Sequence, residues 1–129
     1  MNFNNQQPIY LQIADYVLEG ILSKHYQAGD RIESVREMAA NTQVNPNTVM
    51  RTFTFLQDKD IIFNRRGIGF FIADDALKRT QAIKREEFVQ QQLPELFKMM
   101  DLLGIKISDL ESLYQSHYQS QQNTQNGAH

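Results

Sequence analysis

Two helix-start signals close together in the sequence constrain the fold of this chain more than any other feature. Ser34 is placed to cap one helix, with Glu37 positioned to bond back to the cap. Asn45 is placed to cap the next helix, with Pro46 at the first helical position, where its missing N–H costs nothing. Only a short helix that fades near Asn41 and a brief turn fit between the caps. The segment therefore predicts a helix-turn-helix.

A further helix is expected before this pair. After Pro8, a proline at a tolerated first-turn position, apolar residues recur at helical spacing as far as Leu22. The helix that begins at Pro46 has its own apolar stripe and is expected to end near Asp58. Three consecutive helices are thus predicted in the first half of the chain.

A β-hairpin is predicted directly after the third helix. Ile61–Arg65 and Gly69–Ile72 are two β-prone runs, joined around Arg66-Gly67-Ile68. Helix, helix, turn, helix and hairpin is the order of a winged helix-turn-helix. The fold class is therefore expected to be mainly α with a small β-hairpin, over residues 1–74.

The remaining residues predict a two-helix C-terminal appendage over residues 75–118. From Asp75 the apolar spacing is helical to Leu103, and Gly104 is a suitable stop. Pro94 interrupts this run and is expected to kink the helix or divide it in two, because it lacks the N–H and crowds the preceding turn.

A second capping box, Ser108-Asp109-Leu110-Glu111, is expected to open a final short helix that reaches Tyr118. From Gln119 onward the chain is rich in Gln, Ser and Asn, without an apolar cluster. We expect residues 119–129 to form a disordered tail.

Composition limits the function classes but does not choose among them. The chain has 129 residues, no cysteine and a net charge of −2. Residues 1–80 hold nine Lys or Arg and nine Asp or Glu, so the first part is neutral and the acidity lies later. The start resembles no signal peptide, and no apolar run approaches the ~20 residues of a membrane span. We expect a cytoplasmic protein with no membrane partner.

Three motifs in order give a resemblance to a known family. The segments 28–39 (AGDRIESVREMA), 44–49 (VNPNTV) and 65–72 (RRGIGFFI) are similar to the DNA-binding domain of the GntR family. The resemblance covers about residues 9–73 and implies a DNA-binding transcription regulator. Three positions depart from the family pattern: Glu33 where proline is usual, Phe70 where threonine is usual, and Met50 where some members carry an arginine.

The short appendage resembles that of the YtrA-type branch of the GntR family. Fewer than sixty residues follow the hairpin, whereas most relatives carry a much larger effector domain. The resemblance implies a helical region that serves dimerization, repression, and control of a neighbouring transporter operon. It gives no basis for naming a small-molecule effector, and we expect no cofactor.

The candidate DNA-binding residues lie on three elements. A recognition helix enters the major groove with its N-terminal end, which here carries short polar residues and an arginine one turn on. The hairpin tip is basic, and the resemblance implies a DNA contact for the arginine of the second helix. The predicted set is Arg36, Asn45, Asn47, Thr48, Arg51, Arg65, Arg66 and Gly67.

Several of these residues have a structural alternative. Asn45 and Thr48 could only cap the helix, and Arg36 could pair with Glu33 or Glu37, at a gain of only ~0–1 kcal/mol. Asn47 and Arg51 have no such alternative. Basic hairpin tips are also common on ordinary protein surfaces.

An apolar stripe on the appendage has little intrachain core to cover it, which favours burial against a second copy. The predicted homodimer interface is Phe88, Leu93, Leu96, Phe97, Met100 and Leu103. A cofactor pocket between these helices is an alternative, but no polar cluster marks one. The three histidines are isolated in the sequence and show no metal-ligand spacing.

The leading hypothesis is therefore sequence-specific binding of double-stranded DNA by a homodimer that reads an inverted repeat. The main alternative is a winged helix that binds another protein and no DNA, which the neutral charge favours. An enzyme is the weakest alternative, because the sequence has no cysteine, no phosphate loop and no paired carboxylates in an apolar setting.

Overall fold

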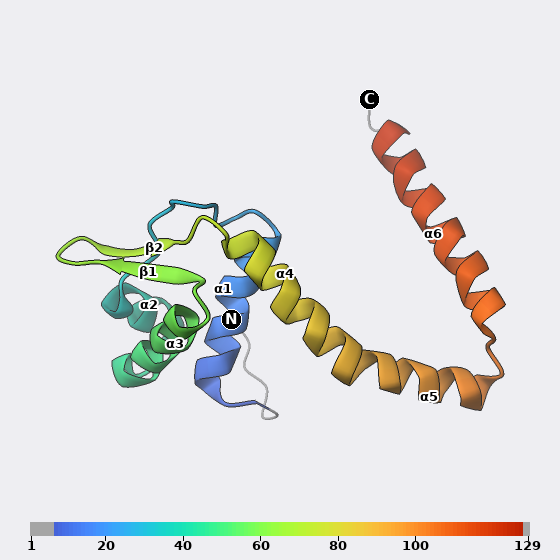
Figure 1. The fold of residues 1–129 in the computed structure, drawn as a ribbon, viewed down its shortest axis with the longest axis horizontal. Helices are drawn as coiled ribbons and strands as arrows, with labels where there is room; N and C mark the ends of the chain where they lie inside the picture. The colour runs from blue at the N-terminus through green and yellow to red at the C-terminus, as the bar shows by residue number, and fades with distance from the viewer. Residues whose placement is uncertain (1–6, 128–129) are drawn as a thin grey trace. The chain divides into compact units, whose positions relative to one another are not determined.

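A computed structural model describes residues 7–127. The chain divides into two compact units, and the boundary between them in the sequence falls between Arg85 and Glu86. The first unit consists of helices and a hairpin, and the second unit is helical (Figure 1). No helix of the described residues is long and apolar enough to cross a membrane. Each unit is described here by itself.

Three helices form the centre of the first unit: α1 (Ile9–Leu22), α2 (Val35–Thr42) and α3 (Pro46–Asp58). Both α1 and α2 pack on α3. Most residues of the predicted apolar stripes are buried, because residues three and four apart share one helix face, but Ile9 and Leu22 at the two ends of the α1 stripe are exposed. Pro8 lies just before α1 as its N-cap, not in its first turn. The core residues of the helices are Ile13, Val17, Leu18, Ile21, Met38, Val49, Phe53 and Leu56.

The capping box that begins α2 is confirmed. The Ser34 hydroxyl accepts a hydrogen bond from the Glu37 N–H at 3.1 Å, and the Glu37 carboxylate accepts one from the Ser34 N–H at 3.3 Å. The chain leaves α2 through Gln43, whose φ of 56° lies in the left-handed region. This conformation reverses the chain quickly enough for α3 to begin at Pro46, as the sequence predicts.

The predicted hairpin is also confirmed, as β1 (Ile62–Arg65) and β2 (Gly69–Ile72). The strands are antiparallel, and Ile62 lies opposite Ile72 on the buried side. The segment before α2 pairs with the other edge of β2, where the Ile32 N–H donates a hydrogen bond to the Phe70 carbonyl at 3.0 Å. Strand β2 is therefore paired on both of its sides.

The first unit extends beyond the predicted boundary at residue 74. Helix α4 (Ala76–Glu87) contributes Ala76 to the core and buries Thr80. Lys84 then donates a hydrogen bond to the Asp15 carboxylate of α1 at 2.7 Å. These contacts place most of α4 in the first unit, which ends at Arg85.

Pro94 lies at the start of a new helix. A π-helical turn, Phe88–Gln92, precedes α5 (Leu93–Leu103), and the Leu93 N–H donates to the Phe88 carbonyl five residues back. Because proline has no N–H and crowds the turn before it, the ladder widens there. The predicted interruption is thus a wide turn followed by a helix with Pro94 in its first turn.

Gly104 ends α5 with a φ of 69°, as predicted, and Ile105 donates its N–H to the Met100 carbonyl at 2.9 Å. The expected capping role of Ser108 is wrong, because α6 (Ile107–Gly127) already begins at Ile107. The Asp109 carboxylate instead accepts a hydrogen bond from the Lys106 N–H at 3.0 Å. Asp109 therefore satisfies the backbone at this helix start.

The expected disordered tail also differs from the structure, where α6 continues past Tyr118 to Gly127. Glutamine favours helix, and no proline or glycine interrupts the segment before Gly127. Local propensity therefore carries the helix on without an apolar face. The last two residues of the predicted tail lie outside the described residues.

Two fully buried threonines give a matched test of this core. The Thr52 hydroxyl donates to the Tyr10 carbonyl at 2.7 Å, whereas the Thr80 hydroxyl has no partner among the described residues. We expect Thr80→Val to raise the free energy of unfolding by about 1 kcal/mol, because it removes an unsatisfied buried hydroxyl at nearly constant shape. Thr52→Val should lower it by a similar amount. Urea denaturation measures both, and equal signs for the two variants would contradict the assignment.

Candidate nucleic-acid interface

The start of α3 presents its polar residues to solvent. The Asn45 side-chain oxygen accepts the Asn47 N–H at 2.8 Å, so Asn45 is the cap, as the structural alternative held. The Asn47 side chain is exposed and forms no hydrogen bond with the described residues, while Thr48 is half-buried. Asn47 is therefore the residue of this turn whose side chain is fully available to a ligand.

Arg51 lies one turn further along α3 and does have a structural role, contrary to expectation. Its guanidinium carbon lies 4.1 Å from the centroid of the Tyr10 ring of α1. The Tyr10 ring in turn meets Phe55 edge-on at 6.4 Å. A cation held over an aromatic face keeps its N–H edges free. Arg51 is therefore exposed but ordered, and its order comes from α1.

Arg36 is exposed on α2, and neither of the glutamates proposed as its partners forms an ion pair with it. Glu33 accepts a hydrogen bond from the Tyr26 hydroxyl at 2.9 Å. Glu37 is bonded at the α2 cap, where the Ser34 backbone N–H holds the pKa of its carboxyl below the usual value. Pairing with these acids therefore does not account for Arg36.

The wing tip is a tight turn with two basic residues. The Ile68 N–H donates to the Arg65 carbonyl at 2.9 Å, and Gly67 adopts a φ of 78°, which favours glycine. Arg66 is exposed and forms no ion pair with the described residues. Arg65 lies over the Phe71 ring, with its guanidinium carbon 5.0 Å from the ring centroid. Arg65 is thus held by the Phe71 ring, whereas Arg66 has no ion-pair partner among the described residues.

The three elements lie in the same unit. Helix α2 packs on α3, α3 contacts β1, and the hairpin projects beyond the two helices (Figure 1). All of the predicted DNA-binding residues are exposed except the half-buried Thr48. The polar leading edge of α3 is therefore open to a ligand, which is the condition on which the sequence hypothesis depends.

Two departures from the family pattern have a structural reason. Phe70, in place of threonine, meets the buried Phe53 ring edge-on at 4.9 Å and ties the wing to α3. Glu33, in place of proline, bonds Tyr26. Met50, in place of arginine, is 41% exposed on α3. No sequence pattern indicates these two contacts: Phe70 and Phe53 belong to different elements, and Tyr26 and Glu33 lie in the irregular segment between α1 and α2.

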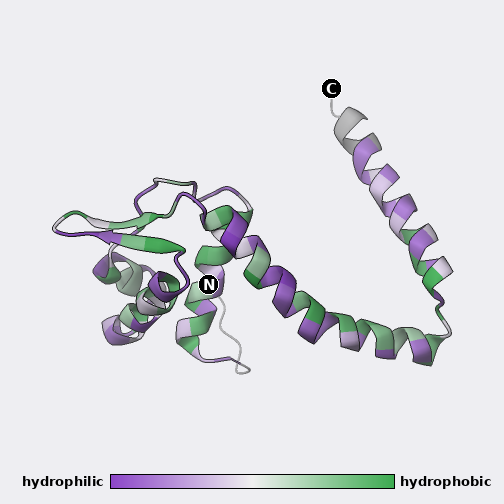
Figure 2. Ribbon diagram, in the orientation of Figure 1, coloured by the Kyte–Doolittle hydropathy of each residue, from purple (hydrophilic) through white to green (hydrophobic). Residues whose placement is uncertain are grey.

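The predicted dimer residues lie in the second unit, where the structure gives them different environments. Hydrophobic residues lie along α5, whereas α6 is mostly hydrophilic (Figure 2). Phe88, Leu96, Phe97 and Leu103 are exposed, and Leu93 is half-buried. Met100 is only 5% exposed, because the chain turns back beside it after Gly104. Met100 is therefore already covered within its own chain, unlike the exposed members of the predicted interface.

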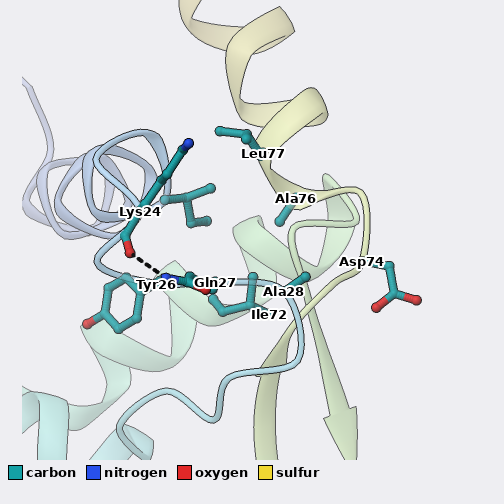
Figure 3. Close-up of a pocket in the computed structure, with 9 residues that line it drawn as sticks. Lys24, Tyr26, Gln27, Ala28, Ile72, Asp74, Ala76 and Leu77 are labelled. Atoms are coloured by element: carbon teal, nitrogen blue, oxygen red, sulfur yellow. Dashed lines mark hydrogen bonds between the residues drawn. The ribbon is translucent and has the colours of Figure 1, made fainter.

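A cavity of about 300 Å³ lies in the first unit, where the end of α1 and the start of α4 come together (Figure 3). The Lys24 carbonyl beside it accepts a hydrogen bond from the Gln27 amide at 3.4 Å. None of the candidate DNA-binding residues lines this cavity. Its walls are formed by Ile21, Lys24, Tyr26, Gln27, Ala28, Ile72, Asp74, Ala76 and Leu77.

Groups suited to holding a metal ion are missing from the described part of the chain, in which no three His, Cys, Asp or Glu residues gather. What the structure does gather on one unit is a polar helix start and several exposed arginines. Such a surface suits hydrogen bonding to base edges and phosphates.

Comparison with known proteins agrees with this surface. Residues 9–72 match the family model described as bacterial regulatory proteins, gntR family. The HTH-type transcriptional regulator YhcF of Bacillus subtilis (strain 168) is 40% identical over 103 residues, covering 80% of this chain and 84% of YhcF. The HTH-type transcriptional repressor YtrA of the same organism is 33% identical over 103 residues, covering 80% of this chain and 78% of YtrA.

A solved structure gives the same result. A crystal structure assigned to a transcriptional regulator of the GntR family from Bacteroides thetaiotaomicron superposes with a TM-score of 0.74 at 41% identity. The match covers 88% of this chain and 98% of that protein, and so reaches beyond the wing into the appendage.

The Tyr26–Glu33 bond gives a pH-dependent test of the segment that leads into α2. Burial, together with the bond to Glu33, raises the pKa of the Tyr26 hydroxyl well above its usual value. The folded state therefore prefers the neutral phenol. Its contribution to stability is complete below the unfolded pKa of ~10 and is lost as the pH rises toward the folded pKa.

Tyr26→Phe should accordingly be less stable than wild type at neutral pH, by about 1 kcal/mol for the lost hydrogen bond. It should also lose less stability on going from neutral pH to above pH ~10, because the titrating group is absent. Urea midpoints across this range measure the difference, and parallel pH profiles for the two proteins would contradict it.

Proposed function

The chain belongs to the GntR family of bacterial regulatory proteins, and from this premise we propose that it is a repressor that binds an inverted-repeat operator as a homodimer. Family membership makes it a transcriptional regulator with a DNA-binding helix-turn-helix, and not an enzyme. The observation that carries the finer proposal is the exposed leading edge of α3 beside a basic wing.

Base reading is assigned to the start of α3. In helix-turn-helix proteins the N-terminal end of the recognition helix enters the major groove. The free carboxamide of Asn47 can pair with an adenine edge, and the Arg51 guanidinium can pair with guanine. Its contact with Tyr10 lowers the conformational freedom that Arg51 would lose on binding. Asn45 retains only its amide N–H groups for DNA, because its oxygen caps the helix.

Backbone contacts are assigned to the flanking elements. In this proposal Arg36 on α2, Thr48 on α3 and the tip residues Arg66 and Gly67 contact phosphates or enter the adjacent minor groove. These contacts fix the orientation of the protein on the duplex and act on every DNA sequence alike. The neutral charge of residues 1–80 is no obstacle, since Arg36, Arg51 and Arg66 are exposed and contact depends on where the charges lie.

Self-association is assigned to α5 and the turn before it. Phe88, Phe97 and Leu103 are 47%, 47% and 64% exposed, which leaves an apolar face without a partner in the single chain. A second copy would cover this face and supply a second recognition helix. Two such helices would meet half-sites about one helical turn, ~10 bp, apart.

Repression is proposed because the relative YtrA is described as a repressor. Control of a neighbouring transporter operon is proposed from the resemblance to the YtrA-type branch alone. The proposal includes no small-molecule effector and no cofactor.

Two substitutions separate base reading from backbone contact. Asn47→Ala should weaken binding to the operator by about 1–3 kcal/mol and relax its sequence preference, because a base-edge contact is lost. Arg66→Ala should weaken binding to all DNA sequences and lower the salt slope by about 0.9, because one phosphate contact is lost. Fluorescence anisotropy with operators selected from a random pool measures both.

Thr54→Ala is the control, since Thr54 is exposed on α3 and donates a hydrogen bond to the Met50 carbonyl of the same helix at 3.0 Å. It should bind like wild type. Wild-type binding by both Asn47→Ala and Arg66→Ala would refute the assigned reading surface.

The proposed dimer has a matched pair of variants. Phe97 on α5 is 47% exposed and Ile9 on α1 is 45% exposed. Phe97→Glu should yield monomers, because a carboxylate would have to be desolvated in the apolar contact, whereas Ile9→Glu should leave the dimer intact. Size-exclusion chromatography with light scattering measures the mass. A wild-type monomer at micromolar concentration, or a Phe97→Glu dimer, would rule out this interface.

A further inference from the structure

One face of the wing gathers arginines and phenylalanines around a glycine. Across the hairpin, Phe63 lies opposite Phe71 and Arg65 lies opposite Gly69, while Arg31 bridges to Phe71 from the other side. Paired and alternate residues of a sheet share a face, so these residues project opposite to the buried side. We call this set the outer wing face: Arg31, Phe63, Arg65, Gly69 and Phe71.

The two phenylalanines hold Arg65. Their rings are stacked, with centroids 5.9 Å apart and an angle of 26° between the planes. The Arg65 guanidinium carbon lies 5.0 Å from the Phe71 centroid and 5.7 Å from the Phe63 centroid. Both distances are within the range of a cation–π interaction. Arg65 is exposed, so the rings restrict its guanidinium while leaving its N–H groups accessible.

Gly69 makes room for Arg31. A Cβ atom at residue 69 would lie 2.9 Å from the Arg31 Nε and 3.5 Å from one of its terminal nitrogens. The Arg31 side chain therefore occupies the space that a side chain at residue 69 would fill. Arg65 lies directly across the hairpin from Gly69, so the Arg31 side chain lies over the residue that pairs with Arg65.

Neither Arg31 nor Arg65 forms an ion pair within residues 7–127. The Glu37 carboxylate accepts a hydrogen bond from the Ser34 N–H, and this bond lowers its pKa more than the charge of Arg31 does. Two neighbouring guanidinium groups that form no ion pair repel each other and match the geometry of a phosphate, which can accept hydrogen bonds from both.

We propose that Arg31 and Arg65 form a phosphate-binding site on the outer wing face, which holds one backbone phosphate of the DNA, and that Phe63 and Phe71 position Arg65 for it. The inference rests on the proposed DNA-binding function and adds Arg31 to the binding residues. In this arrangement Arg66 contacts the DNA from the wing tip, and Arg31 and Arg65 contact it from the outer wing face.

The salt dependence of binding tests the site. Arg31→Ala and Arg65→Ala should each weaken binding to any duplex, by roughly tenfold. The double variant should lower the salt slope by about 0.9, the value for one phosphate. A double variant with an unchanged slope would overturn the site. A loss of about 1.8 would overturn the sharing of one phosphate, because it would indicate two separate contacts.

Arg79→Ala is the matched control for charge. Arg79 is an arginine of the same unit outside the wing, with the Asp60 carboxylate 3.9 Å away. It should leave both affinity and salt slope unchanged, as measured by anisotropy with a labelled duplex of random sequence. An equal loss in this variant would mean that net charge, not the arginine pair, sets the slope, and would overturn the inference.

The positioning role of the rings has its own readout. Phe71→Leu keeps an apolar side chain but removes the π face, so binding should weaken roughly threefold. Phe71→Tyr keeps the ring and should bind like wild type. In the Arg65→Ala background, Phe71→Leu should have no further effect, because its effect acts through Arg65. A loss in that background equal to the loss in wild type would overturn the positioning role, with thermal unfolding verifying that each variant is folded.

These outcomes separate the inference from the proposed function. If Asn47→Ala and Arg66→Ala behave as proposed while the arginine double variant keeps its slope, only the outer wing face is excluded. If the wild-type protein binds no operator, both proposals fail together.

Discussion

The whole reading surface depends on the burial of one stripe of α3 against α1. Val49, Phe53 and Leu56 have no exposed surface, and burying side chains of this size stabilises a fold by about 1.5–3 kcal/mol each. The same burial fixes the rotation of the helix about its axis. Because residues on opposite sides of a helix cannot both face the core, Asn47 and Arg51 must face outward. The interface is thus a geometric consequence of the core.

The features that the sequence predicted are those whose cause is local. The capping box of Ser34 and Glu37, the start of α3 at Asn45 and the turn at Gly67 each depend on residues within a few positions of one another. The contacts that the sequence did not predict join distant segments. Tyr10 meets Arg51, and Arg31 lies beside Gly69, and no periodicity can indicate such pairs.

The second unit shows a different limit of sequence reasoning. Met100 has the helical spacing of a stripe residue, and spacing alone cannot tell a side chain buried in its own chain from one that awaits a partner. The extension of α6 to Gly127 likewise follows from weak propensities summed along a polar segment, in which no single residue marks a helix. The winged unit was therefore largely predictable, whereas the environments in the appendage were not.

The contacts that hold α4 in the first unit determine how easily this helix can separate from it. Ala76 and the partly buried Ile83 pack against the core, the buried Thr80 hydroxyl has no hydrogen-bond partner among the described residues, and Lys84 forms an ion pair with Asp15. Little apolar surface becomes exposed when such a helix separates from the rest, so that opening requires much less free energy than unfolding of the three-helix core. Helix α4 is accordingly the element of this unit best suited to detach by itself, as a cooperative segment that leaves the recognition helix undisturbed.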